Sequence, residues 1–188
     1  SGKFIVLEGI SGSGKDTQAK LLTAYLKNRG IKTKLINRPS EEMRQLWKEW
    51  RKHSNNPMSE LYLMLADGYH IVKDKILPSL NKGEYVISVR SSLSAQAYQY
   101  VNEVTSCFLR YAFNFEPMPD ILIYLDIDPI IAQSRARQES SFFRHVQKKE
   151  EKRFKKIFKE YPNVILINAD HSAQNVHKEI IAKINRLI

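Results

Sequence analysis

The chain is predicted to fold as an α/β protein, a three-layer sandwich in which a five-stranded parallel sheet carries helices on both faces. Short apolar runs alternate with longer amphipathic stretches along the sequence. The apolar runs are nearly continuous, which is typical of strands buried on both faces. No linker, repeat or low-complexity segment divides the chain, so residues 1–188 are expected to form a single domain.

Five strands are expected, at Phe4–Glu8, Thr33–Ile36, Tyr85–Ser88, Ile121–Leu125 and Val164–Ile167. Seven helices are expected between and after them, at Lys15–Arg29, Glu41–Lys52, Ser59–Leu80, Ser92–Phe115, Pro129–Gln138, Arg144–Tyr161 and Ala173–Leu187. Gly30 is expected to end the first helix, and Gly83 the third after Pro78 interrupts it. Ligands are then expected at the carboxyl ends of the strands, where the strand order reverses.

Composition narrows the class of protein. The single cysteine, Cys107, excludes a disulfide framework and indicates a reducing compartment, so a cytoplasmic location is expected. No apolar run approaches the roughly 20 residues that a membrane helix needs. The net charge of +10 raises the question of nucleic acid, but polyanionic nucleotide substrates explain part of this excess equally well. Small nucleotides are therefore favoured over nucleic acid as partners.

A glycine-rich segment joins the first strand to the first helix. The pattern G-x-x-x-x-G-K between a strand and a helix indicates a phosphate-binding loop, in which glycines let backbone amides approach an anion. Lys15 is placed to reach the terminal phosphates of a nucleotide as a point charge. The residues expected to bind that nucleotide are Gly9, Ile10, Ser11, Gly12, Ser13, Gly14, Lys15, Asp16 and Thr17.

One position departs from this pattern. A Ser or Thr hydroxyl that binds Mg²⁺ normally follows the lysine, but here Asp16 follows it and the hydroxyl comes one residue later, at Thr17. A carboxylate beside a polyphosphate is tolerable if a cation lies between them. We therefore expect Asp16 and Thr17 to hold Mg²⁺, directly or through water.

Further motifs follow in order and carry a family resemblance. They are Phe4–Gly9 with the loop, Val86-Ile87-Ser88-x-Arg90, Ala97-Tyr98-Gln99, Pro119-Asp120-Ile121 leading to Tyr124–Pro129, and Ile167–Asp170 through Val176–Ile180. In this order they resemble the thymidylate kinase family over nearly the whole chain. The resemblance implies a P-loop nucleoside monophosphate kinase with a short lid at about 138–145. It also implies transfer of the γ-phosphoryl group of ATP–Mg²⁺ to a nucleoside monophosphate, with dTMP as the first-choice acceptor.

Cations are the groups that such a transfer needs, because negative charge gathers around the phosphoryl group in flight. The resemblance assigns this role to Lys15, Arg90, Arg135, Arg137 and Arg144, the last three at or near the lid. The alternatives are a structural ion pair for Arg90 and a plain surface position for each lid arginine.

The expected acceptor site contains several departures from the family pattern. Val89 replaces an aspartate, Ser11 replaces another, Asn37-Arg38-Pro39 replaces Arg-Glu-Pro, and Gly68 stands in the place of an arginine that helps hold the acceptor phosphate. Asp16 is expected to lie near position 89 and to supply the carboxylate lost there. The residues expected to bind the acceptor are Ser11, Arg38, Tyr62, Asp67, Arg90, Tyr98 and Gln99.

These departures leave other functions open. Glu8 lies where related deoxynucleoside kinases place a general base, so a nucleoside kinase, or a monophosphate kinase of altered acceptor preference, is one alternative. A nucleotide-binding protein with weak catalysis is another. A nucleic-acid-binding P-loop protein would require a basic face away from the nucleotide cleft. The apolar side of Ser94–Phe115 fits a core face or the interface of a homodimer equally well.

Overall fold

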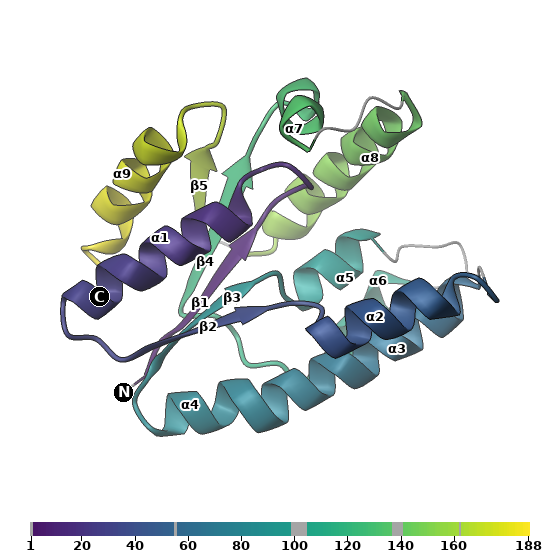
Figure 1. The fold of residues 1–188 in the computed structure, drawn as a ribbon, viewed down its shortest axis with the longest axis horizontal. Coiled ribbons are helices and arrows are strands. Elements are labelled where there is room, and N and C mark those ends of the chain that lie inside the picture. Colours follow the sequence, from purple (N-terminus) through teal and green to yellow (C-terminus); the bar gives the residue numbers. More distant parts are fainter. Residues whose placement is uncertain (1, 55, 99–104, 137–140, 162) are drawn as a thin grey trace.

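The computed structural model describes residues 2–54, 56–98, 105–136, 141–161 and 163–188, and contains one five-stranded sheet (Figure 1). The strands are β1 (Phe4–Glu8), β2 (Thr33–Asn37), β3 (Tyr85–Val89), β4 (Ile121–Asp126) and β5 (Val164–Asn168). All neighbouring strands are parallel, in the order β2-β3-β1-β4-β5. This confirms the predicted fold class, and each strand agrees with its expected range to within one residue.

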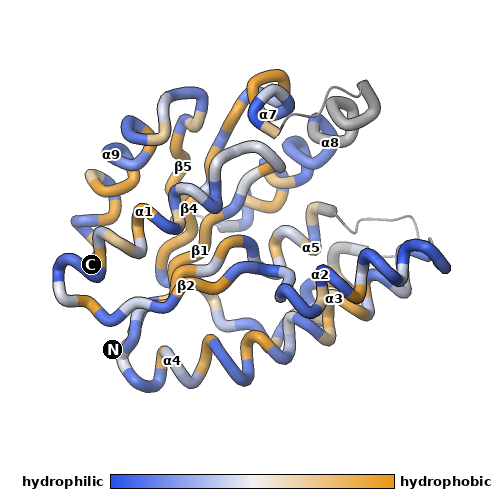
Figure 2. Tube along the Cα trace, viewed as in Figure 1, coloured by the Kyte–Doolittle hydropathy of each residue, from blue (hydrophilic) through white to orange (hydrophobic). Residues whose placement is uncertain are grey.

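The sheet is apolar because its central strands are covered on both faces. Every residue of β1 is buried, and β1 pairs with β3 on one side and β4 on the other. Figure 2 shows the strands as the most continuously hydrophobic part of the chain, whereas the helices alternate between the two colours. The strand that leads into the phosphate-binding loop is therefore fixed in place by its two neighbouring strands and by its burial.

The helices lie on both sides of this sheet (Figure 1). They are α1 (Lys15–Asn28), α2 (Glu41–Trp50), α3 (Pro57–Ile71), η1 (Val72–Ile76), α4 (Leu77–Asn81), α5 (Ser92–Tyr98), α6 (Ser106–Ala112), α7 (Pro129–Arg135), α8 (Ser141–Phe158) and α9 (Ala173–Ile184). Helix α1 packs against α9, while α5 packs against both α3 and α8. Helix α8 is anchored by Phe154 and Phe158, whose rings contact Tyr124 of β4.

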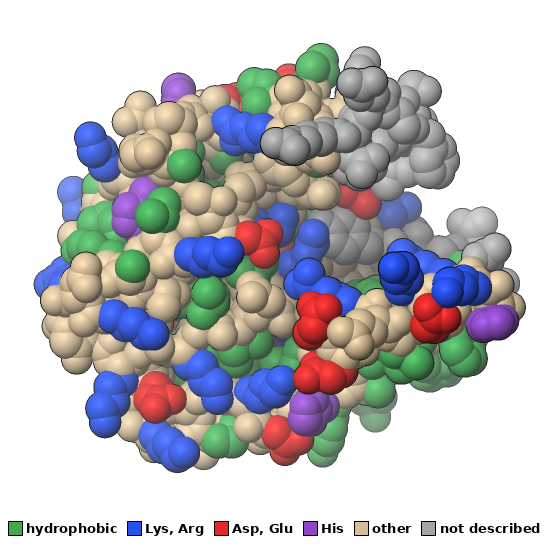
Figure 3. All heavy atoms as spheres, in the orientation of Figure 1, with side chains coloured by type: hydrophobic (Ala, Val, Ile, Leu, Met, Phe, Trp, Pro, Cys, Tyr) green, Lys and Arg blue, Asp and Glu red, His purple; other side chains and the backbone are tan. Residues whose placement is uncertain are grey.

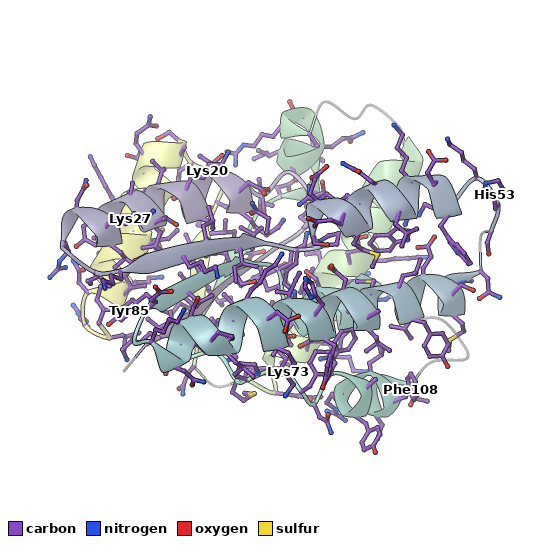
Figure 4. The ribbon with its side chains drawn as sticks, turned by 60° about the horizontal axis from the view of Figure 1, so that its bottom comes forward. Lys20, Lys27, His53, Lys73, Tyr85 and Phe108 are labelled. Carbon is purple, nitrogen blue, oxygen red and sulfur yellow. The ribbon has the colours of Figure 1, made fainter. Side chains whose placement is uncertain are left out.

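The segment from α3 to α4 is a continuous helical rod. It runs beneath the sheet in Figure 4, where Lys73 marks its middle and His53 lies at the far tip of the α2–α3 connection. The expected interruption at Pro78 takes the form of the wide π-helical turn η1, which lies directly before α4, and Pro78 sits in the first turn of α4. Proline cannot donate to the preceding turn, and a wide turn adjusts the hydrogen-bond register there. Gly83 ends the rod with a φ of 76°.

The expected single helix at Ser92–Phe115 is wrong. The structure has two helices, α5 and α6, and Thr105 begins the second by accepting a hydrogen bond from the Phe108 amide at 3.1 Å. Leu109 and Phe113 of this region are buried in a second apolar cluster with Leu61 and Ala95, so these residues face the core. Cys107 on α6 is exposed.

No helix within the described ranges is long and apolar enough to cross a membrane. The two chain ends lie near each other, at the edge of the sheet where the strands begin (Figure 1). The connections that leave the opposite, carboxyl edge are therefore free to form a site.

Candidate active site

The phosphate-binding loop leaves the carboxyl end of β1 and enters α1. Gly14 begins α1 in the left-handed region with a φ of 89°, and Gly12 has a φ of 82°. A Cβ at Gly12 would lie 2.1 Å from the carbonyl oxygen of Ala132, so only glycine fits there. The side chain of Ile10 is buried in the core, which leaves its backbone to face the loop.

Lys15 is folded back into this loop. Its Nζ donates to the Ile10 carbonyl oxygen at 2.8 Å and to Ser13 Oγ at 3.3 Å. Burial, followed by the nearby positive charge of Arg90, lowers the pKa of Lys15 to about 7. The ammonium group is thus held inside the loop at the place where an anion would bind.

Glu8 is fully buried at the end of β1. Its two carboxylate oxygens accept hydrogen bonds from Ser91 Oγ and Ser94 Oγ, each at 2.6 Å, and the Ser94 amide donates at 3.3 Å. Burial raises the pKa of Glu8, although the two serine hydroxyls oppose that shift. Glu8 therefore organises the start of α5.

Arg90 follows β3 directly and lies beside the loop. Its backbone adopts a φ of 74°, which is uncommon and strained for a residue other than glycine. The Arg90 amide donates to the Leu7 carbonyl oxygen at 3.0 Å, and Nη1 donates to Ser94 Oγ at 3.3 Å. A strained backbone at a strand end, fixed by hydrogen bonds from both the amide and the side chain, indicates a functional position.

A pocket of about 240 Å³ opens next to Arg90, and its lining is partly apolar. Figure 3 shows the molecular surface hollowed beside helices α2 and α3, with Lys and Arg side chains at the edge. The lining residues are Arg38, Pro39, Trp47, Met64, Asp67, Gly68, Arg90, Ser91, Ser94, Ala95 and Phe113. A pocket with two arginines and an aromatic wall suits a nucleoside monophosphate.

The structure brings some of the expected acceptor residues into this pocket. Arg38 lines it, and Nη1 of Arg38 pairs with Glu116 Oε1 at 2.6 Å. Asp67 also lines it, and its carboxylate accepts hydrogen bonds from the Ser40 amide and hydroxyl. Tyr62 is 59% exposed on α3 and is not part of the lining. The side chain of Tyr98, and Gln99, lie outside the described residues.

The expected metal ligands lie at the mouth of the loop. Asp16 and Thr17 are exposed on the first turn of α1, and Asp16 lines a second groove along the end of β2. Val89 of β3 is buried and pairs with Leu7 of β1, so β3 lies beside β1 as expected. Within the described ranges no cluster of three or more Asp, Glu, His or Cys side chains forms a metal site.

The expected lid is described only in part. Arg135 ends α7 and donates to three backbone carbonyl oxygens after β5, those of Ala169 at 2.7 Å, His171 at 3.0 Å and Asp170 at 3.2 Å. Arg137 and the side chain of Arg144 lie outside the described residues. In this conformation Arg135 links α7 to the turn before α9.

Sequence reasoning missed Glu150, which lies on α8. Burial raises the pKa of Glu150 to about 7, against the positive charges of Arg90, Lys15 and Arg153. It belongs to the lysine-rich run at residues 148–159, a pattern that is typical of a solvated helix face. The sequence carried no signal that α8 turns this carboxylate toward the phosphate site.

The match to known proteins agrees with this geometry. A sequence profile described as thymidylate kinase matches residues 7–180. The chain belongs to the thymidylate kinase family. It is 34% identical to a probable thymidylate kinase of Pyrococcus abyssi, over 96% of this chain and 95% of the relative. It is 32% identical to a thymidylate kinase of Glaesserella parasuis (95% and 93%) and 33% identical to a probable thymidylate kinase of Thermococcus kodakarensis (98% of each).

Membership confirms the expected enzyme class, a phosphotransferase that acts on a nucleoside monophosphate. Arg38, Gly68 and Arg90 all line the acceptor pocket, close to the phosphate-binding loop.

Proposed function

We propose that this chain transfers the γ-phosphoryl group of ATP to dTMP, giving ADP and dTDP. The observation that carries the proposal is the position of Arg90, which lies beside Lys15 of the loop and also lines the neighbouring pocket. A guanidinium there reaches both the donor phosphates and the acceptor phosphate. It is thus placed to stabilise the charge that develops between them.

The donor phosphates are bound by the amides of the loop and by Lys15, which exchanges its contacts with Ile10 and Ser13 for phosphate oxygens. During transfer the bond from the γ-phosphorus to the β–γ bridging oxygen breaks, and a bond to an acceptor phosphate oxygen forms. The electron pair of the broken bond stays on ADP. Arg90 and Arg38 hold the acceptor phosphate in line with the departing ADP.

The contacts of Glu8 favour a monophosphate over a nucleoside as acceptor. A nucleoside hydroxyl needs a base, whereas a phosphate oxygen is already an anion. Both carboxylate oxygens of Glu8 are engaged by Ser91 and Ser94, and Glu8 is fully buried. This engagement supports a monophosphate as the acceptor, since it leaves Glu8 holding the two serines.

Mg²⁺ fits the residues at the mouth of the loop. The carboxylate of Asp16 and the hydroxyl of Thr17 are exposed on one helical turn beside Lys15, and oxygen donors suit this cation. When bound there, Mg²⁺ supplies positive charge to the phosphate oxygens of ATP. Arg137 and Arg144, with Arg135 after release of its carbonyl contacts, are proposed to close the lid at about 138–145 and so exclude water.

A panel of acceptors tests the proposal. The protein is incubated with ATP–Mg²⁺ and each nucleoside or nucleoside monophosphate, and ADP release is measured. Turnover with dTMP is expected. Turnover with thymidine but not with dTMP would instead identify a nucleoside kinase, and saturable ATP binding without turnover on any acceptor would identify a nucleotide-binding protein.

A further inference from the structure

Arg38 is held in the pocket wall by contacts that this chain supplies from distant segments. It follows β2, its side chain is only 8% exposed, and its amide donates to the Val89 carbonyl oxygen at 3.2 Å. Nη1 of its guanidinium is bonded to Glu116 at 2.6 Å. A buried guanidinium with one carboxylate partner retains further donors, and here the group lies at a pocket wall.

Glu116 connects two parts of the acceptor pocket. Its side chain is 5% exposed, with Oε1 bonded to Arg38 and Oε2 accepting from the Ser92 amide at 2.9 Å. Ser92 is the first residue of α5 and lies two positions after Arg90. One buried carboxylate therefore fixes Arg38 relative to the turn that carries Arg90.

Gly68 leaves the space that the guanidinium of Arg38 occupies. It lies inside α3, where glycine costs roughly 1 kcal/mol relative to alanine, and it is not among the glycines with positive φ. A Cβ at this position would lie 3.0 Å from Nη2 of Arg38 and 3.5 Å from the ring of Phe113. Backbone conformation does not require glycine here, but the close approach of Arg38 favours it.

We propose that Glu116 and Gly68 position Arg38 as the cation that binds the phosphate group of the acceptor. Glu116 is then a positioning residue, and the missing side chain at Gly68 lets the guanidinium lie against α3 and face the pocket. The ligand group is a phosphate monoester. This inference rests on the proposed function, since it assigns the acceptor to the pocket lined by Arg38 and Arg90.

Direct binding measurements with dTMP and thymidine test it, because the two ligands differ only in the phosphate group. In the Glu116→Gln variant the preference for dTMP over thymidine is expected to fall about tenfold, the scale of one charge-assisted hydrogen bond. Thymidine and ATP affinities should stay unchanged, and KM for dTMP should rise more than kcat falls. The matched control is Glu60→Gln, which removes the carboxylate of the outlying Arg51–Glu60 pair and should leave the preference intact.

The Gly68→Ala variant separates this role from a purely structural one. The added methyl group displaces Nη2, so dTMP binding is expected to weaken several-fold, while the better helix propensity of alanine keeps the melting temperature from falling. The inference is overturned if wild-type protein phosphorylates dTMP but both variants keep the full preference for dTMP over thymidine. If wild-type protein phosphorylates no monophosphate, it is the proposed function that fails.

Discussion

At the scale of single residues, the phosphate site holds two groups that titrate near neutrality. The pKa of Lys15 is lowered to about 7 and that of Glu150 is raised to about 7, in each case chiefly by burial. Glu8 and Asp16 act on Lys15 in the opposite direction, by favouring its charged form. The free site therefore gains negative charge, or loses positive charge, as pH rises through 7.

ATP affinity is accordingly expected to fall as pH rises through about 7, by up to about tenfold per pH unit for each proton involved. Bound phosphates favour charged Lys15 and neutral Glu150, so binding takes up protons. Calorimetry at pH 7.5 in two buffers with different ionisation enthalpies measures that uptake.

Glu150→Gln is expected to reduce the proton uptake, whereas Glu151→Gln, whose carboxylate pairs with Lys155, should not. Proton release on ATP binding would contradict the assignment.

A second residue-scale prediction concerns Arg90. Arg90→Gly removes the guanidinium and places glycine where φ is 74°, so the variant loses the charge without adding backbone strain. We expect kcat to fall by roughly 100-fold or more, while ATP affinity and melting temperature change little. Steady-state kinetics and a thermal melt check this, and a loss confined to KM for ATP would argue against a role in the transition state.

The loop residues and Arg90 could be predicted from the sequence because they are contiguous with recognisable strand ends. Glu116 and Glu150 could not, since their significance depends on partners brought close only by folding. Arg38 and Glu116 are 78 positions apart, and Glu150 lies in a run that resembles any charged helix. Whether such a carboxylate is buried depends on the tertiary structure, so it cannot be predicted from the local sequence pattern.

At the scale of elements, Ser40 joins α2 to α3 beside the acceptor pocket. Its hydroxyl accepts from the Met43 amide at the start of α2 and donates to Asp67 of α3. The Ser40→Ala variant is expected to lose about 1–3 kcal/mol of unfolding free energy, because it removes a helix cap and leaves a buried carboxylate without one donor. Denaturant unfolding measures this loss.

Ser172→Ala is the matched control, since Ser172 caps α9 at the exposed surface through the Asn175 amide alone. That variant should lose only about 1 kcal/mol. Equal losses in the two variants would mean that the contact with Asp67 contributes nothing.

Strand positions could be predicted closely because buried parallel strands are short apolar runs with clear limits. The helices were less predictable. Apolar spacing continues from Ser92 to Phe115, so the new start at Thr105 was hidden in a helical pattern. Pro78 suggested a break, which takes the form of the wide turn η1.

At the scale of the whole molecule, the positive charge is not confined to the active site. Lys27, Lys32, Lys34 and Lys82 border a shallow groove at the edge where β2 and β3 begin, away from the phosphate-binding loop. Figure 4 shows Lys27 near that end of α1 and Lys20 closer to the loop. Such a surface attracts polyanions without reading their sequence.

Labelled DNA is therefore expected to bind weakly at low salt, and to be released steeply as salt approaches physiological levels. Saturating ATP should not displace it, because the groove and the loop lie apart. Fluorescence anisotropy with and without ATP measures both effects. Competition between ATP and DNA would instead place the polyanion in the nucleotide cleft.

The π-helical turn between α3 and α4 sets how far α3 is rotated about the helix axis relative to α4. Each residue of a helix adds about 100° of rotation, so removing one residue from Val72–Ile76 would swing Asp67 and Gly68 around the axis while α4 stayed anchored. The lining of the acceptor wall thus depends on a count of residues well outside it. Insertions or deletions in this turn offer a way to change which α3 side chains face the acceptor pocket, while the sheet and the phosphate-binding loop stay unchanged.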